Sequence, residues 1–295
     1  MKVFVTGGAG FIGSHLVPAL LKAGHRVTVY DNLCNGKAEN LPPEPMSFLF
    51  FQEDIRDIEN LRKRMKGAEV VYHLAALPRI TPSLENPVEA HDVNLTGTLN
   101  VLQVARENRA HVVFAGSSSI FGKGAVVPMR ENDPKNPNSP YAMQKLMAES
   151  YIQMYRSLWN LKATVLRFFN VFGERQPETG AYAVVAGIFM GQKQRGEQLT
   201  IKGDGSQRRD FTYVGDVVKA LLAVGERGIE GTYHIGTGKN VSVQELADAI
   251  DPGGQRKQIE MSVGDYPVTL ADITKARDTF DYEPNVNILD WLKQC

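Results

Sequence analysis

The stretch TGGAGFIGSHL (residues 6–16) decides the fold class of this chain of 295 residues. It overlaps the end of a short strand-like run, KVFVTG (2–7), and leads into a segment with helical character. Gly7, Gly10 and Gly13 have the spacing G-x-x-G-x-x-G. Between a strand and a helix, such glycines let the backbone approach a pyrophosphate, whose negative charge the helix N-terminus stabilises. The stretch therefore predicts a dinucleotide site.

Strand-like apolar runs alternate with helix-like segments through the first two thirds of the chain. The runs are continuous rather than alternating, as expected for strands that are buried on both faces. The strand candidates are 2–7, 25–31, 47–54, 69–76, 111–117 and 162–173. The helix candidates are 13–23, 57–66, 88–108 and 140–158. This order predicts an α/β fold with a Rossmann-like, doubly wound parallel sheet.

The pattern loosens after residue 173, and we expect a smaller C-terminal lobe interleaved with the sheet domain. The predicted boundaries place residues 1–170, with about 211–236, in the nucleotide-binding domain. The smaller, substrate-binding lobe is expected over about 171–210 and 237–295.

Composition narrows the classes of partner. The chain carries 33 Lys+Arg and 33 Asp+Glu, so its net charge gives no reason to expect nucleic acid or an anionic membrane surface. It has 2 cysteines, which form no disulfide framework and favour a reducing, cytoplasmic compartment. No apolar stretch reaches the length of a membrane span, and the N-terminus does not resemble a signal peptide. The histidines show no metal-ligand spacing, so no metal is expected.

The acidic residues at two predicted strand ends indicate which dinucleotide binds. Asp31 closes the second strand, where a carboxylate accepts hydrogen bonds from a ribose diol and repels a 2′-phosphate. The nearest following cation is Lys37, so the sequence favours NAD over NADP. Asp54 closes the third strand, where it would flank the adenine or cap the next helix.

The segment SPYAMQK (139–145) contains a candidate acid/base pair. Tyr141 and Lys145 are four residues apart, which puts both side chains on one face of a helix. A phenol has a pKa of about 10, and acting as a base near neutrality requires a decrease of about 3 units, or roughly 4 kcal/mol. One cation at about 4–6 Å, with an effective dielectric near 20, supplies about 3–4 kcal/mol. Lys145 is therefore a suitable partner for Tyr141.

Together these segments form a set that resembles a known family. In order they are TGGAGFIGSHL, VYDNL, DIRD, VYHLAA, VNLTGTLNVL, SSSIFG, SPYAMQK, RFFNVFGERQP, GDGSQRRDFTYVGDV and HIGTG. The chain is similar along its whole length to the extended short-chain dehydrogenases/reductases, in particular the NAD-dependent sugar-nucleotide epimerases and dehydratases. The resemblance implies NAD as a tightly held cofactor and a nucleoside-diphosphate sugar as substrate.

The resemblance also implies roles for individual residues. A Ser–Tyr–Lys triad falls on Ser117, Tyr141 and Lys145. Besides Tyr141 and Lys145, cofactor contacts fall on Gly7, Gly10, Phe11, Ile12, Gly13, Asp31, Asn32, Asp54, Ile55, Leu74, Ala75, Ala76, Asn94 and Phe168. Besides Ser117 and Tyr141, substrate contacts fall on Asn170, Thr200, Lys202, Arg209, Asp265 and Thr269.

The two serines after the triad serine bear on the type of reaction. In the family's dehydratases these positions are typically Asp and Glu, whereas here they are Ser118 and Ser119. A hydroxyl cannot replace a carboxylate as acid or base near neutrality. The stretch therefore argues against dehydration and decarboxylation, and it resembles that of the UDP-hexose 4-epimerases. A dehydratase, a 4-ketosugar reductase, a UDP-glucuronate 4-epimerase and a non-catalytic NAD-binding protein remain alternatives.

Three departures from the family pattern concern the substrate. Ser262 replaces a second phosphate-binding arginine, for which Arg256 and Lys257 are candidate substitutes. Lys202 stands where an aromatic residue often stacks near the base. Thr269 occupies the position that gates the sugar 2-substituent, which suggests room for an N-acetyl group, unless it is simply a strand residue.

The resemblance further implies a homodimer. Family members commonly pack two helices from each subunit into a four-helix bundle, and the matching segments here are 92–107 and 140–157. An apolar stripe on such a helix equally suits a core-facing helix.

Overall fold

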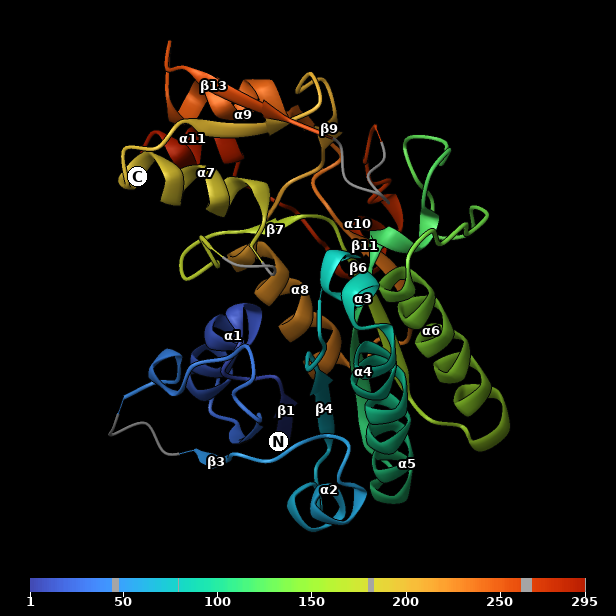
Figure 1. The fold of residues 1–295 in the computed structure, drawn as a ribbon. Coiled ribbons are helices and arrows are strands. Elements are labelled where there is room, and N and C mark those ends of the chain that lie inside the picture. Colours follow the sequence, from blue (N-terminus) through green and yellow to red (C-terminus); the bar gives the residue numbers. More distant parts are fainter. Residues whose placement is uncertain (44–47, 79, 180–182, 261–266, 295) are drawn as a thin grey trace. The chain divides into compact units, whose positions relative to one another are not determined.

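A computed structural model describes the chain except for residues 44–47, 79, 180–182, 261–266 and 295 (Figure 1). The chain divides into two compact units. The first unit comprises Met1–Ser117, Ser139–Arg167 and Val218–Tyr233, and the second comprises Ser118–Asn138, Phe168–Val217 and His234–Cys295.

The boundaries of these units differ from the predicted ones. Four segments that were expected in the nucleotide-binding domain lie in the second unit, namely 118–138, 168–170, 211–217 and 234–236. Segment 118–138 is held there by backbone hydrogen bonds. The Met129 amide donates to the Leu270 carbonyl, and the Asp272 amide donates to the Met129 carbonyl.

The first unit is built around a seven-stranded parallel sheet in the order β11-β6-β5-β4-β1-β2-β3. Its strands are β1 (Lys2–Thr6), β2 (Arg26–Tyr30), β3 (Leu49–Phe51), β4 (Val70–His73), β5 (His111–Ser117), β6 (Ala163–Phe168) and β11 (Gly231–Ile235). Strand order reverses between β1 and β4, which are paired in register from Val3↔Val70 to Thr6↔His73. In doubly wound folds this reversal opens a crevice at the carboxyl ends of the strands, and ligands bind there.

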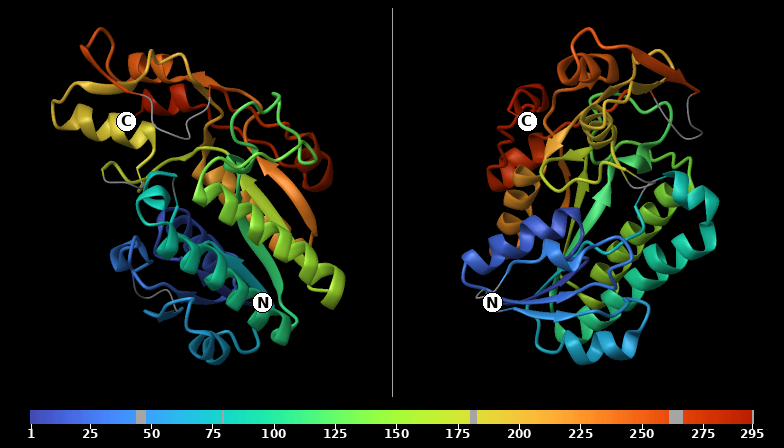
Figure 2. Two further views of the ribbon diagram at one scale, coloured as in Figure 1. Left: turned by 45° about the vertical axis from the view of Figure 1, so that its right-hand side comes forward. Right: turned by 60° about the vertical axis from the view of Figure 1, so that its left-hand side comes forward.

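Helices cover both faces of this sheet. They are α1 (Phe11–Lys22), α2 (Ile58–Arg64), α3 (Ile80–Glu85), α4 (Pro87–His91), α5 (Thr98–Asn108), α6 (Pro140–Trp159) and α8 (Val214–Arg227). Phe4, Val71 and Phe114 share one apolar cluster with side chains of α2, α5 and α6. The neighbouring strand residue Tyr72 points to the other face, where its ring is close to Gly225 of α8. Helices α5 and α6 run side by side (Figure 2).

Two predicted elements are interrupted in the structure. The predicted helix 88–108 consists of α4, a π-helix at Asp92–Gly97 and α5. The predicted strand 162–173 divides into β6 and β7 (Val171–Phe172), because Asn170 between them has a positive φ of 29°. Local interruptions of this kind occur often at functional sites.

The second unit has a smaller core between helices and two-stranded sheets. Its elements are α7 (Val185–Gln194), β8 (Leu199–Lys202), β9 (Arg208–Arg209), β10 (Thr212–Tyr213), β12 (Val241–Ser242), α9 (Val243–Ile250), β13 (Arg256–Ile259), α10 (Thr274–Phe280) and α11 (Ile288–Leu292). The apolar side chains Phe189, Ile201, Leu246 and Leu292 pack together in this core. Short 3-10 helices lie at Ala38–Asn40 in the first unit and Ser118–Phe121 in the second. Within the described residues, no helix has the length and apolar character needed to cross a membrane.

A buried carboxylate organises the loops of the second unit. Asp210 is fully buried, and it accepts hydrogen bonds from the amides of Thr237 (2.8 Å), Gly238 (3.1 Å) and Ala271 (3.0 Å). It also accepts one from the Thr237 hydroxyl at 2.7 Å. Burial raises the pKa of Asp210, and these four donors oppose that rise.

We therefore expect Asp210→Asn to lower the free energy of unfolding by about 3 kcal/mol, because an amide nitrogen facing buried N–H donors leaves them unsatisfied. Urea denaturation followed by fluorescence measures this. The matched control is Asp204→Asn at an exposed turn carboxylate bonded to Ser206, where the change in unfolding free energy should be much smaller. Equal effects of the two substitutions would contradict the role of Asp210.

Candidate functional site

The glycine-rich turn lies between β1 and α1, and its three motif glycines are present for different reasons. Gly7 has φ +72°, and a Cβ there would lie 2.6 Å from the Ala75 nitrogen. A Cβ on Gly13 would lie 2.3 Å from the Gly7 oxygen. A Cβ on Gly10 would meet only the Gly7 oxygen, at 3.3 Å. Packing within the chain therefore requires Gly7 and Gly13, whereas Gly10 leaves space for a close approach from outside.

Gly10 is also the N-cap of α1, and it supplies no side-chain cap. The first amides of a helix have no partner within the helix, so those after Gly10, at Phe11, Ile12 and Gly13, suit an anionic ligand. A diphosphate fits this turn on two grounds, the space over Gly10 and the uncapped helix end.

Asp31 follows β2 and is tied to the glycine-rich turn. Its carboxylate accepts hydrogen bonds from the amides of Ala9 (2.9 Å) and Leu33 (2.8 Å). Burial raises its pKa, while these two bonds oppose the rise. Each carboxylate oxygen keeps a further lone pair, which a ribose hydroxyl could use. Lys37 is exposed and lies 3.3 Å from Glu39, so it is already paired.

Asp54 and Asn32 meet beyond the ends of β2 and β3. The Asn32 amide donates to Asp54 Oδ2 at 2.8 Å, and Arg56 makes two side-chain hydrogen bonds to the same carboxylate. The Arg56 guanidinium lowers the pKa of Asp54 to about 2. The alternative prediction that Asp54 caps the next helix is wrong, since Asp57 is the N-cap of α2.

A hydrogen-bonded chain fixes the turn after β4, which carries Leu74, Ala75 and Ala76. The Ala75 amide donates to Thr6 Oγ1 at 3.3 Å, and Thr6 Oγ1 lies 2.7 Å from His73 Nδ1. His73 Nε2 lies 2.9 Å from Thr98 Oγ1. Burial lowers the pKa of His73 to about 3, so the ring is neutral.

The proton positions in this chain follow from its last member. Thr98 donates its hydroxyl hydrogen to the Asn94 carbonyl at 2.7 Å, so it accepts from His73 Nε2–H. His73 Nδ1 must then accept the hydroxyl hydrogen of Thr6. A neutral histidine of fixed tautomer thus joins β1, β4 and the start of α5.

Asn94 lies in the π-helix and is buried, with its side chain occupied by the protein. Its Oδ1 accepts from the Leu77 amide at 2.8 Å, and its Nδ2 donates to the Leu77 carbonyl at 3.0 Å. Nδ2 also donates to Gln144 Oε1 on α6 at 2.8 Å. These contacts hold the turn after β4 against α6. Ile55, another expected cofactor residue, is buried in the apolar core of this unit.

The three predicted triad residues all belong to the first unit. Ser117 ends β5, and Tyr141 and Lys145 lie in the first two turns of α6. Lys145 is buried, and its Nζ donates to the Ala115 carbonyl at 2.9 Å, two residues before Ser117. Nζ also lies 6.0 Å from the Tyr141 ring centroid. Burial lowers the pKa of Lys145 to about 8, while the nearby Glu149 carboxylate raises it.

The start of α6 orients Tyr141. Ser139 is the N-cap, where its hydroxyl accepts from the Ala142 amide at 3.2 Å, and Pro140 occupies the first turn. The Tyr141 amide donates to the buried Ser83 hydroxyl of α3 at 3.1 Å. Tyr141 therefore lies in the first turn of α6, which is held from two sides.

Two charged residues beside this centre are not among the site residues predicted from the sequence. Glu149 lies one turn beyond Lys145 on α6, and Arg167 lies on β6. They form a buried ion pair, with 2.7 Å between Arg167 Nη2 and Glu149 Oε2. Two signals were available in the sequence. One is the 141/145/149 spacing, and the other is a single cation within a strand of otherwise uncharged residues.

Three of the expected substrate residues come together in the second unit. Asn170 Nδ2 donates to Thr269 Oγ1 at 3.2 Å and to the Asp210 carbonyl at 2.9 Å. Thr269 Oγ1 also accepts from the Asp210 amide at 3.0 Å. Arg209 Nη1 donates to the Pro267 carbonyl at 3.3 Å, two residues from Thr269. The Thr269 hydroxyl is thus bonded within the chain, and its expected place beside the sugar 2-substituent stays a prediction.

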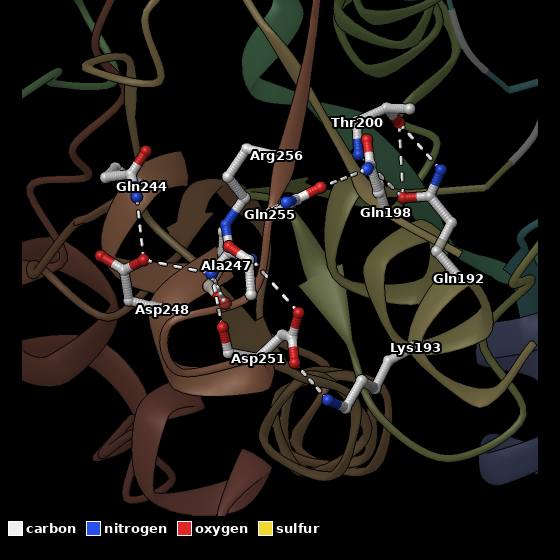
Figure 3. Close-up of polar contacts among 11 residues, drawn as sticks. Gln192, Lys193, Gln198, Thr200, Gln244, Ala247, Asp248, Asp251, Gln255 and Arg256 are labelled. Atoms are coloured by element: carbon white, nitrogen blue, oxygen red, sulfur yellow. Dashed lines mark hydrogen bonds and ion pairs between the residues drawn. The ribbon is translucent and has the colours of Figure 1, made fainter. Parts of the chain in front are cut away.

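Thr200 and Lys202 lie on β8, apart from that group. The Thr200 hydroxyl is bonded to Gln192 of α7 at 3.0 Å (Figure 3). The Gln207 side chain donates to the Lys202 carbonyl at 2.9 Å, which joins β8 to the segment that leads to Arg209.

Arg256 does not stand free to replace the missing phosphate-binding arginine. Its guanidinium donates to the carbonyls of Ala247, Asp251 and Gly254, at the C-terminal end of α9 (Figure 3). Phe168 ends β6 and is buried in the second unit. Ser118 and Ser119 are also buried there. The expected residue Asp265, like Ser262, lies outside the described residues.

Comparison with known proteins agrees with this geometry. The chain is 38% identical to a putative UDP-glucose 4-epimerase of Methanocaldococcus jannaschii, over 99% of this chain and 96% of that protein. Its structure is similar to that of a UDP-N-acetylglucosamine 4-epimerase from Methanobrevibacter ruminantium in complex with UDP-N-acetylmuramic acid. The TM-score is 0.94 at 34% identity, covering 99% of this chain and 96% of that one.

A second structure, the Thermus thermophilus UDP-glucose 4-epimerase in complex with NAD, has a TM-score of 0.90 at 34% identity. The match covers 99% of this chain and 97% of that one. The family model that matches residues 3–236 is described as the NAD dependent epimerase/dehydratase family. Since this match covers most of the chain and the relatives match nearly all of it, the chain belongs to the NAD-dependent epimerase/dehydratase family.

Proposed function

We propose that this protein is an NAD-dependent 4-epimerase of UDP-hexoses. The observation that carries the proposal is the buried Lys145, which is bonded to the Ala115 carbonyl and lies one turn from Tyr141. The two positions after Ser117 hold serines and not carboxylates. Such a centre can move a proton at a hydroxyl but has no second acid for eliminating water. The 4-epimerase relatives support this choice among the family's reactions.

NAD is the proposed cofactor, held by the residues at the carboxyl ends of β1 to β4. Gly10 and the amides that begin α1 suit the pyrophosphate, and Asp31 suits the adenosine ribose. Asn32 and Asp54, which are bonded to each other, would then border the adenine. When bound, NAD would supply a reversible hydride acceptor for C4 of the sugar, so that hydride could return to the other face.

The chain's own residues manage the proton of that step. Tyr141 Oη takes the proton of the sugar 4-hydroxyl and later returns it. The Lys145 ammonium stabilises the phenolate that Tyr141 needs for this role. Ser117 holds the 4-oxygen by a hydrogen bond. Because the hydride returns to the sugar, no net redox change occurs.

The proposed substrate class rests on the second unit. Asn170 and Arg209 bind the diphosphate, and Lys202, with Thr200 beside it on the same strand, lies near the base. The small Thr269 leaves room for a 2-N-acetyl group, so UDP-N-acetylhexosamines are proposed with plain UDP-hexoses. We place Asp265 in the same binding set from the family pattern alone.

A homodimer and a cytoplasmic location complete the proposal. Exposed apolar side chains recur along α6 at helical spacing, namely Met143 (44%), Met147 (43%), Met154 (38%) and Leu158 (63%). An exposed stripe of this kind supports helix pairing between subunits. The free, exposed Cys34 is compatible with a reducing compartment.

Product analysis tests the reaction. We expect the 4-epimer from UDP-glucose, and from UDP-N-acetylglucosamine, when each is incubated with the protein and the products are separated. Tyr141→Phe should lower kcat by about 10²-fold or more, because the proton acceptor is lost, while bound NAD is retained. The absence of a 4-epimer from both sugars and from UDP-glucuronate would reject the assignment, and a keto product would favour a dehydratase.

Two glycine substitutions separate cofactor binding from folding. Gly10→Ala should weaken NAD binding by about tenfold or more, because the methyl group occupies the space left for the pyrophosphate. Gly10→Ala should lower the free energy of unfolding by only about 1 kcal/mol.

Gly13→Ala should lower the free energy of unfolding by about 1–3 kcal/mol, because its methyl group meets backbone atoms. Calorimetric NAD titration and denaturation measure both, and unchanged NAD affinity in Gly10→Ala would contradict the site.

Sedimentation tests the dimer. The wild-type protein should sediment as a dimer at micromolar concentration, and Met147→Glu should shift it to monomer, because the charge would be buried between helices. Leu49→Glu serves as the control. Leu49 lies on β3 and is 60% exposed, so this substitution should leave the dimer intact. A monomeric wild type would end this part of the proposal.

A further inference from the structure

The Glu149–Arg167 ion pair is one of the most deeply buried polar features of the first unit. The two side chains are 3% and 4% exposed, and Arg167 Nε lies 3.1 Å from both carboxylate oxygens. Buried ion pairs contribute little net stability, because desolvation offsets their attraction. The position of this pair within the unit therefore calls for another explanation.

The pair lies beneath the strand end that carries the triad serine. A Cβ on Gly116 would meet Glu149 Oε1 at 3.1 Å and the Arg167 side chain at 3.2 Å. Gly116 stands between Ala115, whose carbonyl binds Lys145 Nζ, and Ser117. The absence of a side chain at this position lets the ion pair contact β5 between those two residues.

Glu149 is also on the same helix face as the acid/base residues. Tyr141, Lys145 and Glu149 are spaced four residues apart on α6, so each lies one turn from the next. Glu149 is therefore the nearer member of the pair to Lys145, and Arg167 reaches it from β6.

The charged and titratable groups around Lys145 come from three elements. Tyr141 and Glu149 face it from α6, and His73 faces it from β4 as a neutral ring. Beyond Glu149, Arg167 of β6 is paired with the Glu149 carboxylate. On β5 its neighbours are uncharged, the Ala115 carbonyl and the Phe114 ring at 4.7 Å. Glu149 is thus the one anion in this set.

We propose that the Glu149–Arg167 pair is a positioning device that keeps the buried Lys145 protonated. Arg167 holds the Glu149 side chain in place within a buried site. Glu149 in turn supplies negative charge one turn from the Lys145 ammonium. The inference rests on the proposed acid/base role of Lys145, and it adds a pair of residues that touch neither cofactor nor substrate.

The titration of Lys145 tests the proposal without any substrate. The Lys145 side-chain resonance in the full-length protein with ¹³C-labelled lysine is followed against pH and assigned by its loss in Lys145→Met. Glu149→Gln should lower the pKa of Lys145 by about 1–2 units, because the negative charge one turn from the ammonium is lost. Arg167→Gln should raise it, because Glu149 is left with Lys145 as its cationic partner.

Two further variants keep the test decisive. Glu149→Met combined with Arg167→Met replaces the pair by apolar side chains of similar size, a change that buried pairs often tolerate. Its Lys145 pKa should lie between those of the wild type and Glu149→Gln. Glu107→Gln removes an exposed carboxylate paired with Arg62 on α2, and it should leave the pKa of Lys145 unchanged.

If the pair had a purely structural role, the variants would not differ in the pKa of Lys145 in this order. If the singly substituted proteins do not fold, the doubly substituted one decides, and an unchanged Lys145 pKa in it would overturn the proposal. Where turnover is measurable, the alkaline limb of kcat should move in the same direction as the pKa. If no UDP-sugar is turned over, the proposed function fails while the titration still judges the ion pair.

Discussion

The close approach of Gly7 to Ala75 is the constraint on which the site depends. These residues follow β1 and β4, the two strands between which the order of the sheet reverses. A side chain at Gly7 would lie 2.6 Å from the Ala75 nitrogen, so the turn after β4 can close only against glycine. Thr6 and His73 then tie the same two strand ends by hydrogen bonds. The glycine-rich turn and the turn after β4 are thereby held at one edge of the sheet.

From this edge, polar contacts extend to the helix that carries the acid/base residues. Asn94 joins the turn after β4 to Gln144 of α6, and Lys145 joins α6 to β5 through the Ala115 carbonyl. The Asn94–Gln144 and Lys145–Ala115 hydrogen bonds are buried, so water does not compete with them. The positions of Tyr141 and Ser117 are in this way coupled to the proposed cofactor site through named hydrogen bonds.

Buried charge is used differently in the two units. In the first, Lys145, Glu149 and Arg167 form a group in which each charge depends on the others. In the second, the Asp210 carboxylate is stabilised by four hydrogen-bond donors from surrounding loops. These donors come from different loops, so separating the loops would remove all of the hydrogen bonds to Asp210. Asp210 therefore holds the loops of its unit together.

The sequence by itself determined the fold class, the glycine-rich turn and the Tyr141–Lys145 spacing, because these follow from local periodicity and from short-range backbone requirements. It also placed Asp31 at the end of β2, whereas β3 ends at Phe51, three residues before Asp54. Only the tertiary structure decided that Arg256 caps α9, that the Thr269 hydroxyl binds Asn170, and that Glu149 pairs with Arg167 beneath Gly116. Those contacts join residues that are 9, 99 and 18 positions apart or come from different elements. No local pattern records such a pairing, because it depends on which elements the fold brings together.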